Sequence, residues 1–241
     1  MSKNWTLLRR WLGVAIVLGA AVGCNSGTDK QGETKPAAIK GDTPGGTTST
    51  AARSTQAKAA APSSDPQYPV VKIETSLGDI VVRLDRQRAP LTVDNFLAYV
   101  EQGFYDQTIF HQVLKNYVIL GGGYTPQLVE KPARGAPVRN EARNGRKNTR
   151  GTIAMARRPD IVDSSTCQFF INLTDSRQLD HKETAPGVYG PPEDYGYCVF
   201  GDVIEGMDVA DKISNVPVHD KGDFERLPVE TVLIKSIRRI Q

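Results

Sequence analysis

The chain has 241 residues, of which 39% are hydrophobic and 24% charged, and its formal net charge is +3 at pH 7. That length fits one domain with appendages or two small domains, and the composition is typical of a soluble globular protein. So small an excess of positive charge gives no reason to expect a nucleic-acid partner. The chain has three histidines and three cysteines, which limits schemes based on a metal or a nucleophile.

The first 24 residues have the pattern of an export signal. Lys3, Arg9 and Arg10 precede the uncharged apolar run WLGVAIVLGAAVG. This run is shorter than the roughly 20 residues of a membrane-spanning helix, so an anchor helix is the less favoured alternative. The run ends at Cys24 in AVGC, which resembles the lipobox of bacterial lipoproteins. Ala21 stands where such boxes usually carry leucine, so ordinary cleavage after Ala21 is the alternative to lipidation of Cys24.

Residues 25–66 are rich in Gly, Thr, Ser, Ala, Lys and Pro, and Ile39 is their one large aliphatic residue. Such a segment buries too little apolar surface to offset the entropy of ordering it. We interpret it as a flexible tether, with an r.m.s. reach of roughly 30–40 Å. An exported lipoprotein built in this way is expected at the periplasmic or cell-envelope face, bound to the membrane through its lipid anchor.

Residues 67–241 are predicted to form one compact domain. YPVVKIETSLGDIVVRL is typical of a hairpin, with SLGD as its turn. In the following APLTVDNFLAYVEQG, four apolar residues share one face of a helix: Val93, Phe96, Leu97 and Val100. Pro90 or Thr92 is expected to start this helix and Gly103 to end it.

The rest of this region alternates short apolar runs with polar, glycine-rich connections. TIAMA, QFFINL, CVFGDVI and VETVLIKSIRRI have strand length, and GMDVADKIS predicts a short helix after Gly206. Many short strands with two helices indicate a β-barrel or β-sandwich that helices cap. Residues 131–158 hold nine Lys or Arg and one acid, Glu141. We expect a solvated loop there, and a patch for acidic partners or lipid head groups is the alternative.

Local motifs do not support phosphate or nucleophile chemistry. Gly121–Gly123 follow an apolar run, but no Lys-Ser/Thr comes after them, and Pro126 and Pro132 oppose a helix there. We therefore expect a turn where backbone segments approach closely. No G-x-S-x-G elbow is present.

Metal chemistry is equally weakly supported. His111, His181 and His219 lie far apart, and we expect His111 to be a packing residue. Cys167 and Cys198 lack C-x-x-C spacing, so we predict two buried thiols, with a disulfide as the alternative in an oxidising compartment.

Several longer motifs occur together and in order: GFYDQTIFH, GGGY, NEARNGRKNTRGTIAMAR, TCQFFINL, LDH and YGYCVFGDVIEGMDVADKI. Together they resemble the bacterial cyclophilins, which are peptidyl-prolyl cis-trans isomerases, and most closely the periplasmic type. The resemblance covers residues 69–240. It implies a mainly β fold, a closed eight-stranded antiparallel β-barrel capped by two α-helices. It also implies Xaa-Pro segments of exported proteins as partners and no metal or cofactor, and we expect a monomer.

The resemblance assigns a role to several matching residues. Phe170 matches the floor of the proline pocket, whereas strand alternation is expected to turn Phe169 into the barrel. The other matching positions are Gln168 in the groove, Ala156 and Arg157 in the segment whose backbone pairs with the peptide, Leu179 in the pocket wall, and Tyr197, where many members carry histidine and periplasmic ones tyrosine.

The run FHQVLKNYVILGG departs from the family pattern F-H-R-V-I-P-G-F-M-I-Q-G-G. Gln112 replaces the arginine that donates to the prolyl nitrogen, and Leu120 replaces the glutamine that helps to orient that arginine. Tyr117 and Val118 replace a phenylalanine and a methionine of the pocket. Gln178 replaces an aromatic residue before LDH.

These changes predict a weakened isomerase that still binds proline peptides. The alternative is a non-catalytic peptide-binding or scaffold module on the same fold. Residues 182–194 form an insertion that borders the pocket by the resemblance, either as a surface loop or as a segment that reshapes access to the site.

Overall fold

The computed structural model describes residues 65–183 and 190–241. The predicted export signal, Cys24, almost all of the predicted tether and the middle of the 182–194 insertion lie outside these described residues. In the described part of the chain, no helix is long and apolar enough to cross a membrane.

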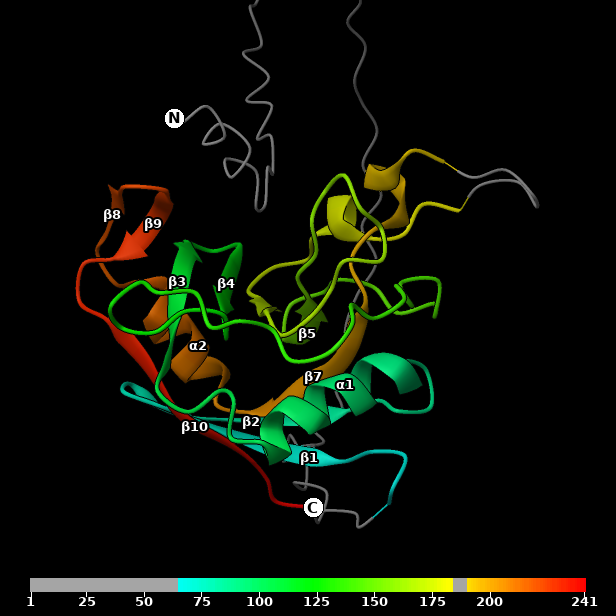
Figure 1. The fold of residues 1–241 in the computed structure, drawn as a ribbon, viewed down its shortest axis with the longest axis horizontal. Coiled ribbons are helices and arrows are strands. Elements are labelled where there is room, and N and C mark those ends of the chain that lie inside the picture. The colour runs from blue at the N-terminus through cyan, green and yellow to red at the C-terminus, as the bar shows by residue number, and fades with distance from the viewer. Residues whose placement is uncertain (1–64, 184–189) are drawn as a thin grey trace, which may run out of the picture. The chain divides into compact units, whose positions relative to one another are not determined.

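Eight strands close a barrel in which every neighbouring pair is antiparallel. Their order around the barrel is β1-β10-β3-β4-β6-β5-β7-β2 (Figure 1). The barrel strands are β1 (Val70–Thr75), β2 (Gly78–Leu84), β3 (Thr108–Leu114), β4 (Val118–Gly121), β5 (Thr152–Met155), β6 (Phe169–Asn172), β7 (Val199–Glu205) and β10 (Val232–Arg239). The predicted closed eight-stranded barrel with two α-helices is confirmed.

The two helices begin and end where the sequence predicts. α1 (Pro90–Glu101) starts at the proline, whose missing N–H costs nothing in a first turn, and Gly103 follows it with a φ of 62°. All four residues of the predicted apolar face of α1 are buried. α2 (Met207–Ser214) follows Gly206, whose φ is 85°.

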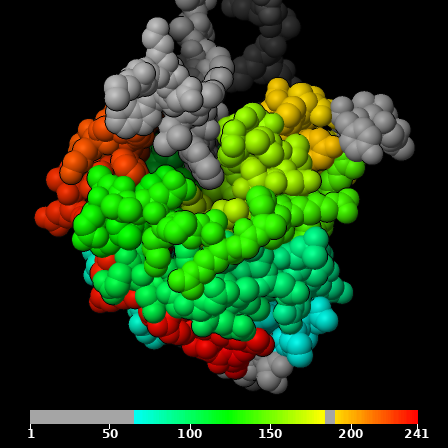
Figure 2. All heavy atoms as spheres, viewed as in Figure 1, coloured from blue at the N-terminus to red at the C-terminus, as the bar shows by residue number. Residues whose placement is uncertain are grey.

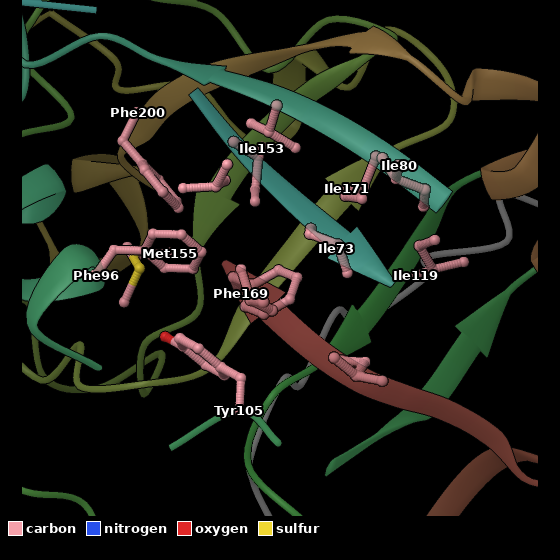
Figure 3. Packing of buried hydrophobic residues seen from close by; sticks show 14 of the residues in the cluster. Ile73, Ile80, Phe96, Tyr105, Ile119, Ile153, Met155, Phe169, Ile171 and Phe200 are labelled. Atoms are coloured by element: carbon pink, nitrogen blue, oxygen red, sulfur yellow. The ribbon is translucent and has the colours of Figure 1, made fainter. Parts of the chain in front are cut away.

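The barrel interior is filled by side chains from alternate positions of the strands and from α1 (Figure 3). The ring of Phe96 on α1 lies 5.7 Å from that of Phe169 on β6 and 5.1 Å from that of Phe200 on β7. Close packing extends to Gly122, where an added Cβ would lie 2.9 Å from ring atoms of both Phe169 and Tyr105. The glycine run is therefore a close backbone approach, as predicted.

One element was not predicted from the sequence. β8 (Val218–Lys221) and β9 (Phe224–Pro228) pair as a separate hairpin that contacts β3. This hairpin, orange to red in Figure 2, lies beside green residues of the β3 region. Its strands are largely exposed, so they lack the apolar runs by which the other strands were predicted.

The structure decides between the alternatives for the two cysteines and for the basic 131–158 segment. Cys167 and Cys198 are free and buried, so the disulfide alternative is wrong and the buried-thiol prediction is confirmed. Burial raises the pKa of Cys167 to about 11 and that of Cys198 to about 12. The basic 131–158 segment is not simply solvated, because Arg146 is ion-paired with Asp85 and Asp202 and its side chain is 14% exposed.

Glu141, the one acid of that basic segment, caps helix α1. Its carboxylate accepts hydrogen bonds from the backbone N–H of Leu91 at 3.2 Å, and from the N–H and hydroxyl of Thr92 at 2.8 and 2.7 Å. The contact joins the long connection between β4 and β5 to the start of the helix, where a negative charge is also favoured by the helix dipole.

We expect Glu141→Ala to lower the free energy of unfolding by about 1–2 kcal/mol, the usual cost of losing an N-terminal helix cap. Urea unfolding followed by circular dichroism measures this change. Glu230→Ala, which removes an exposed carboxylate elsewhere, is the control and should be close to neutral. Equal effects of the two substitutions would contradict the capping role.

Candidate active site on the outer face of the barrel

A β-bulge decides where Gln112 points. In the pairing of β3 with β4, Phe110 lies opposite Gly121 and Gln112 lies opposite Leu120, so His111 is an extra residue in β3. Without the bulge, alternation would put Gln112 on the same face as Phe110, which is in the barrel core. The bulge instead turns Gln112 to the outer face, beside Leu120.

The outer face at this point carries a second apolar cluster. Leu120 on β4 lies opposite Phe170 on β6, which lies opposite Ala154 on β5. The buried residues of the cluster are Val118, Leu120, Ala154, Ala156, Phe170, Leu179 and Val199, and half-buried Leu114, Tyr117 and Tyr197 pack against them. Most of the predicted site residues therefore meet on one face, while Phe169 points into the core as predicted.

Gln178 joins two edges of this outer cluster. It lies in η1 (Arg177–Leu179), and its side-chain amide donates a hydrogen bond to the hydroxyl of Tyr117 at 3.0 Å. Burial raises the pKa of Tyr117 although this bond opposes the rise, so the hydroxyl stays protonated at neutral pH. Gln178 thus borders the cluster where the family pattern has an aromatic residue, and its amide is hydrogen-bonded to the opposite edge of the cluster.

The side chain of Arg157 packs against the edge of the outer cluster. Its guanidinium is buried over the ring of Tyr197, 5.0 Å from the centroid, and donates to the carbonyls of Gly196 and Pro192. Pro192 begins η2 (Pro192–Tyr195), so Arg157 holds the end of the 182–194 insertion. The backbone N–H of Arg157 donates to no described residue, whereas that of Ala156 is taken up by the Gln168 carbonyl at 2.9 Å.

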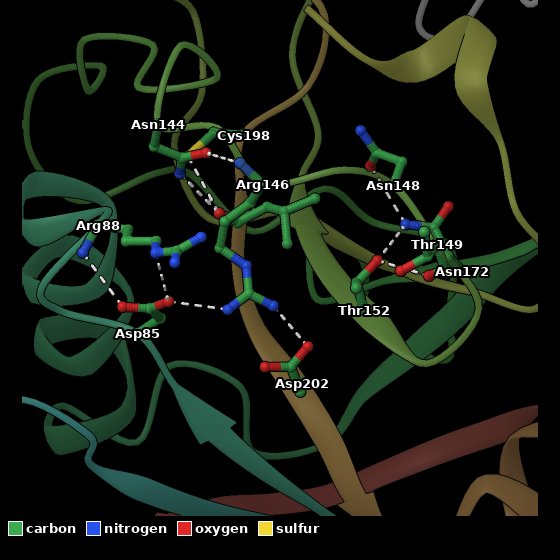
Figure 4. Close-up of polar contacts among 11 residues, drawn as sticks. Asp85, Arg88, Asn144, Arg146, Asn148, Thr149, Thr152, Asn172, Cys198 and Asp202 are labelled. Carbon is green, nitrogen blue, oxygen red and sulfur yellow. Dashed lines mark hydrogen bonds and ion pairs between the residues drawn. The ribbon is translucent and has the colours of Figure 1, made fainter.

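Close packing fixes Gln168, and hydrogen bonds from Asn148 fix the backbone of Leu179 and Tyr197. A Cβ added to Gly123 would lie 2.6 Å from Cγ of Gln168, so the glycine makes room for that buried glutamine. The buried amide of Asn148 donates to the carbonyls of Leu179 at 3.0 Å and Tyr197 at 3.3 Å. Asn148 lies in a polar stretch that looks like ordinary loop, so it was not predicted from the sequence. Figure 4 shows its side chain next to that of Asn172.

The comparisons with known proteins agree with this geometry. The family model for cyclophilin type peptidyl-prolyl cis-trans isomerases matches residues 70–239. The chain belongs to the cyclophilin family. It is 44% identical to peptidyl-prolyl cis-trans isomerase A of Dickeya dadantii (strain 3937) over 171 residues, which are 71% of this chain and 84% of that protein. It is also 44% identical to peptidyl-prolyl cis-trans isomerase B of Escherichia coli (strain K12), covering 70% of this chain and 98% of that one.

A solved structure from the same family superposes on this cyclophilin with a TM-score of 0.59 at 27% identity, covering 71% of this chain and 99% of that one. It is the cyclophilin type peptidyl-prolyl cis-trans isomerase of Cryptosporidium parvum, crystallised in the presence of the dipeptide Ala-Pro. The isomerase family and the barrel predicted from the motifs are therefore confirmed.

The side chain at position 112, on the outer face of β3, is neutral in this cyclophilin. Gln112 is half-buried, and its side chain makes no hydrogen bond with any described residue, which leaves its amide N–H groups available as donors. Across the described ranges, no group of three or more His, Cys, Asp or Glu side chains is arranged to hold a metal ion. What this site offers is an apolar floor, a neutral donor and free backbone polar groups.

His111, the extra residue of the bulge, faces away from this site. Its ring packs edge-on against Tyr124 and Phe224, with centroids 4.6 and 6.5 Å apart, and so joins β3 to the β8–β9 hairpin. Its Nδ1 is buried without a hydrogen-bond partner in the described residues. The packing role predicted for His111 is confirmed, and burial lowers its pKa to about 3.

This buried histidine predicts a dependence of stability on pH. Because the folded pKa lies far below the unfolded value of about 6.5, the unfolded state takes up the proton first, and stability falls as pH drops below about 6.5. Between pH 7.5 and 5 we expect His111 to account for a loss of roughly 2 kcal/mol in the free energy of unfolding, at about 1.36 kcal/mol per pH unit.

Urea unfolding at both pH values tests this expectation. His111→Leu should remove the loss, whereas the control His219→Leu, which changes an exposed histidine, should keep it. An unchanged pH dependence in His111→Leu would contradict the assignment.

Proposed function

We propose that this cyclophilin isomerises Xaa-Pro bonds in exported proteins, at a rate lowered by the presence of Gln112 at its catalytic position. The observation that carries the proposal is the bulge in β3, which places Gln112 on the outer face opposite Leu120 and next to the row that contains Phe170. A relative was crystallised in the presence of Ala-Pro, which supports a proline dipeptide as the minimal ligand.

Isomerisation of an Xaa-Pro bond requires rotation about one bond and no bond cleavage. The peptide C–N bond rotates against a barrier of about 18–20 kcal/mol, and neither proton abstraction nor a covalent intermediate is required. The apolar cluster around Phe170 would take the proline ring, and the free backbone N–H of Arg157 would anchor the flanking peptide. A donor near the prolyl nitrogen stabilises the twisted bond, because amide resonance is lost there and the nitrogen becomes a better acceptor.

Gln112 is a weaker donor than the arginine of the family pattern. A hydrogen bond from a charged group is roughly twice as strong as one between neutral groups. A deficit of a few kcal/mol in the transition state corresponds to roughly 10²–10³ in rate, since 1.36 kcal/mol is a factor of ten. The apolar walls do not depend on this charge, so peptide binding is retained better than turnover.

Introducing the arginine tests this proposal. We expect Gln112→Arg to raise kcat/KM for an Ala-Pro peptide by roughly 10²-fold, because it adds a charge-assisted donor at the prolyl nitrogen. The double variant Gln112→Arg/Leu120→Gln should gain at least as much, since the added amide lies directly across from position 112. Gln112→Leu, which removes the donor without adding charge, is the control and should fall below the wild type.

NMR exchange spectroscopy on an Xaa-Pro peptide reports binding and turnover together. Unchanged exchange in both arginine variants would contradict the role of position 112. A wild type that binds the peptide without exchange would favour the second candidate, a non-catalytic proline-peptide module. That candidate rests on the same neutral site, where Gln112, Leu120 and Gln178 all depart from the family pattern.

We further propose that the protein is a membrane-tethered lipoprotein of the cell envelope, with Cys24 acylated and residues 25–66 as the tether. The basic start, the short apolar run and AVGC support this. Mass spectrometry of the N-terminus from a bacterial host should show a diacylated Cys24, and Cys24→Ala should move the protein from the membrane to the soluble fraction. An unmodified mature N-terminus after Ala21 would contradict lipidation.

A further inference from the structure

A second polar site lies away from the apolar cluster of the isomerase site. It is a cavity of about 390 Å³, and none of its lining residues belongs to that cluster. The lining comes from six parts of the chain: Tyr68, β2, the loop before α1, the connection between Asn144 and β5, Thr152 at the start of β5, and β7. A volume of a few hundred Å³ is the usual size of a small-molecule site.

The cavity carries an excess of positive charge. Four basic side chains line it, Arg83, Arg88, Arg146 and Lys147, against the two carboxylates of Asp85 and Asp202. This leaves a formal excess of two positive charges. The residues lie close together although Asp85 and Asp202 are more than a hundred positions apart, so the cluster exists only in the folded barrel.

The guanidinium of Arg146 forms ion pairs with both acidic side chains of the cavity. Arg146 lies between Asp85, at 2.8 Å, and Asp202, so both carboxylates are paired with this arginine, and Arg88 makes only a long second contact with Asp85 (Figure 4). Burial opposes the charge of Arg146, but its hydrogen bonds to the two carboxylates outweigh burial and raise its pKa. Arg146 is therefore a fixed charge that holds β7 and the loop before α1 together.

The remaining cations have weak or no partners. Arg83 and Lys147 are exposed and form no ion pair with any described residue, and Arg88 reaches Asp85 only at 3.9 Å. The backbone N–H groups of Gly145 and Lys147 also donate to no described residue. The cavity thus combines unpaired positive charge with uncommitted donors.

We propose that this cavity binds a phosphate-bearing anion. A phosphate group carries about −1.5 to −2 charge at pH 7 and several strong acceptor oxygens, which matches the excess of two positive charges better than a single carboxylate does. The volume leaves room for the organic group attached to the phosphate. A free phosphate compound and an anionic lipid head group share this chemistry.

The test uses the full chain and two double variants of equal charge change. Arg83→Gln/Lys147→Gln removes the two unpaired cations of the cavity. Lys221→Gln/Lys235→Gln removes two exposed lysines elsewhere and is the matched control. Inorganic phosphate is titrated at constant ionic strength and followed by NMR, and cosedimentation compares phosphatidylglycerol-containing vesicles with pure phosphatidylcholine vesicles.

If the source is a free phosphate compound, the NMR shifts of Gly145, Lys147 and Thr149 saturate in the wild type and in the control, and the cavity variant binds roughly tenfold or more weakly. If the source is a lipid head group, the cavity variant loses the preference for phosphatidylglycerol and the control keeps it. The proposal is overturned if both double variants respond as the wild type does in both assays, or if both lose binding equally, because only non-specific charge screening would then remain.

Discussion

The two-sided nature of the barrel strands is the constraint on which the rest of the structure depends. Each strand places alternate side chains in the closed core, so only the residues between them point to the outer face. In β3 this rule would bury Gln112 beside Phe110, and the bulge at His111 breaks the rule once. The same local irregularity exposes Gln112 to the site and sends His111 to the β8–β9 hairpin, where its ring packs between aromatic neighbours.

The connection from Asn144 to β5 serves both sites. Asn148 fixes the carbonyls of Leu179 and Tyr197 behind the apolar cluster, and its neighbours Arg146 and Lys147 line the basic cavity. Its polar and basic composition therefore reflects internal bonding as well as solvent exposure. Arg146 also ties this connection to β7, so loss of its charge would be expected to affect the position of the whole segment.

The outer apolar cluster of the barrel is bordered by neutral amide side chains. Its apolar floor is formed by facing residues of neighbouring strands, and these positions follow from barrel pairing rather than from any charged group. Around this floor, the neutral amide of Gln112 lies opposite Leu120, and a second amide, that of Gln178, donates a hydrogen bond to the Tyr117 hydroxyl. Under the function proposed above, the apolar floor serves peptide binding and the amide of Gln112 serves turnover, so a substitution at one of them can change its property without the other.

Much was determined by the sequence alone. Short apolar runs predicted most of the barrel strands, and helix signals predicted both helices. The ordered motifs identified the family and brought Phe170, Leu120 and Tyr197 into one expected site. Only the tertiary structure decided that Cys167 and Cys198 stay apart as thiols, that Arg146 is ion-paired, and that the exposed β8–β9 hairpin exists. Arg146 and its acidic partners are distant in sequence, and the β8–β9 hairpin is local but largely exposed, so neither leaves a periodic apolar pattern along the chain.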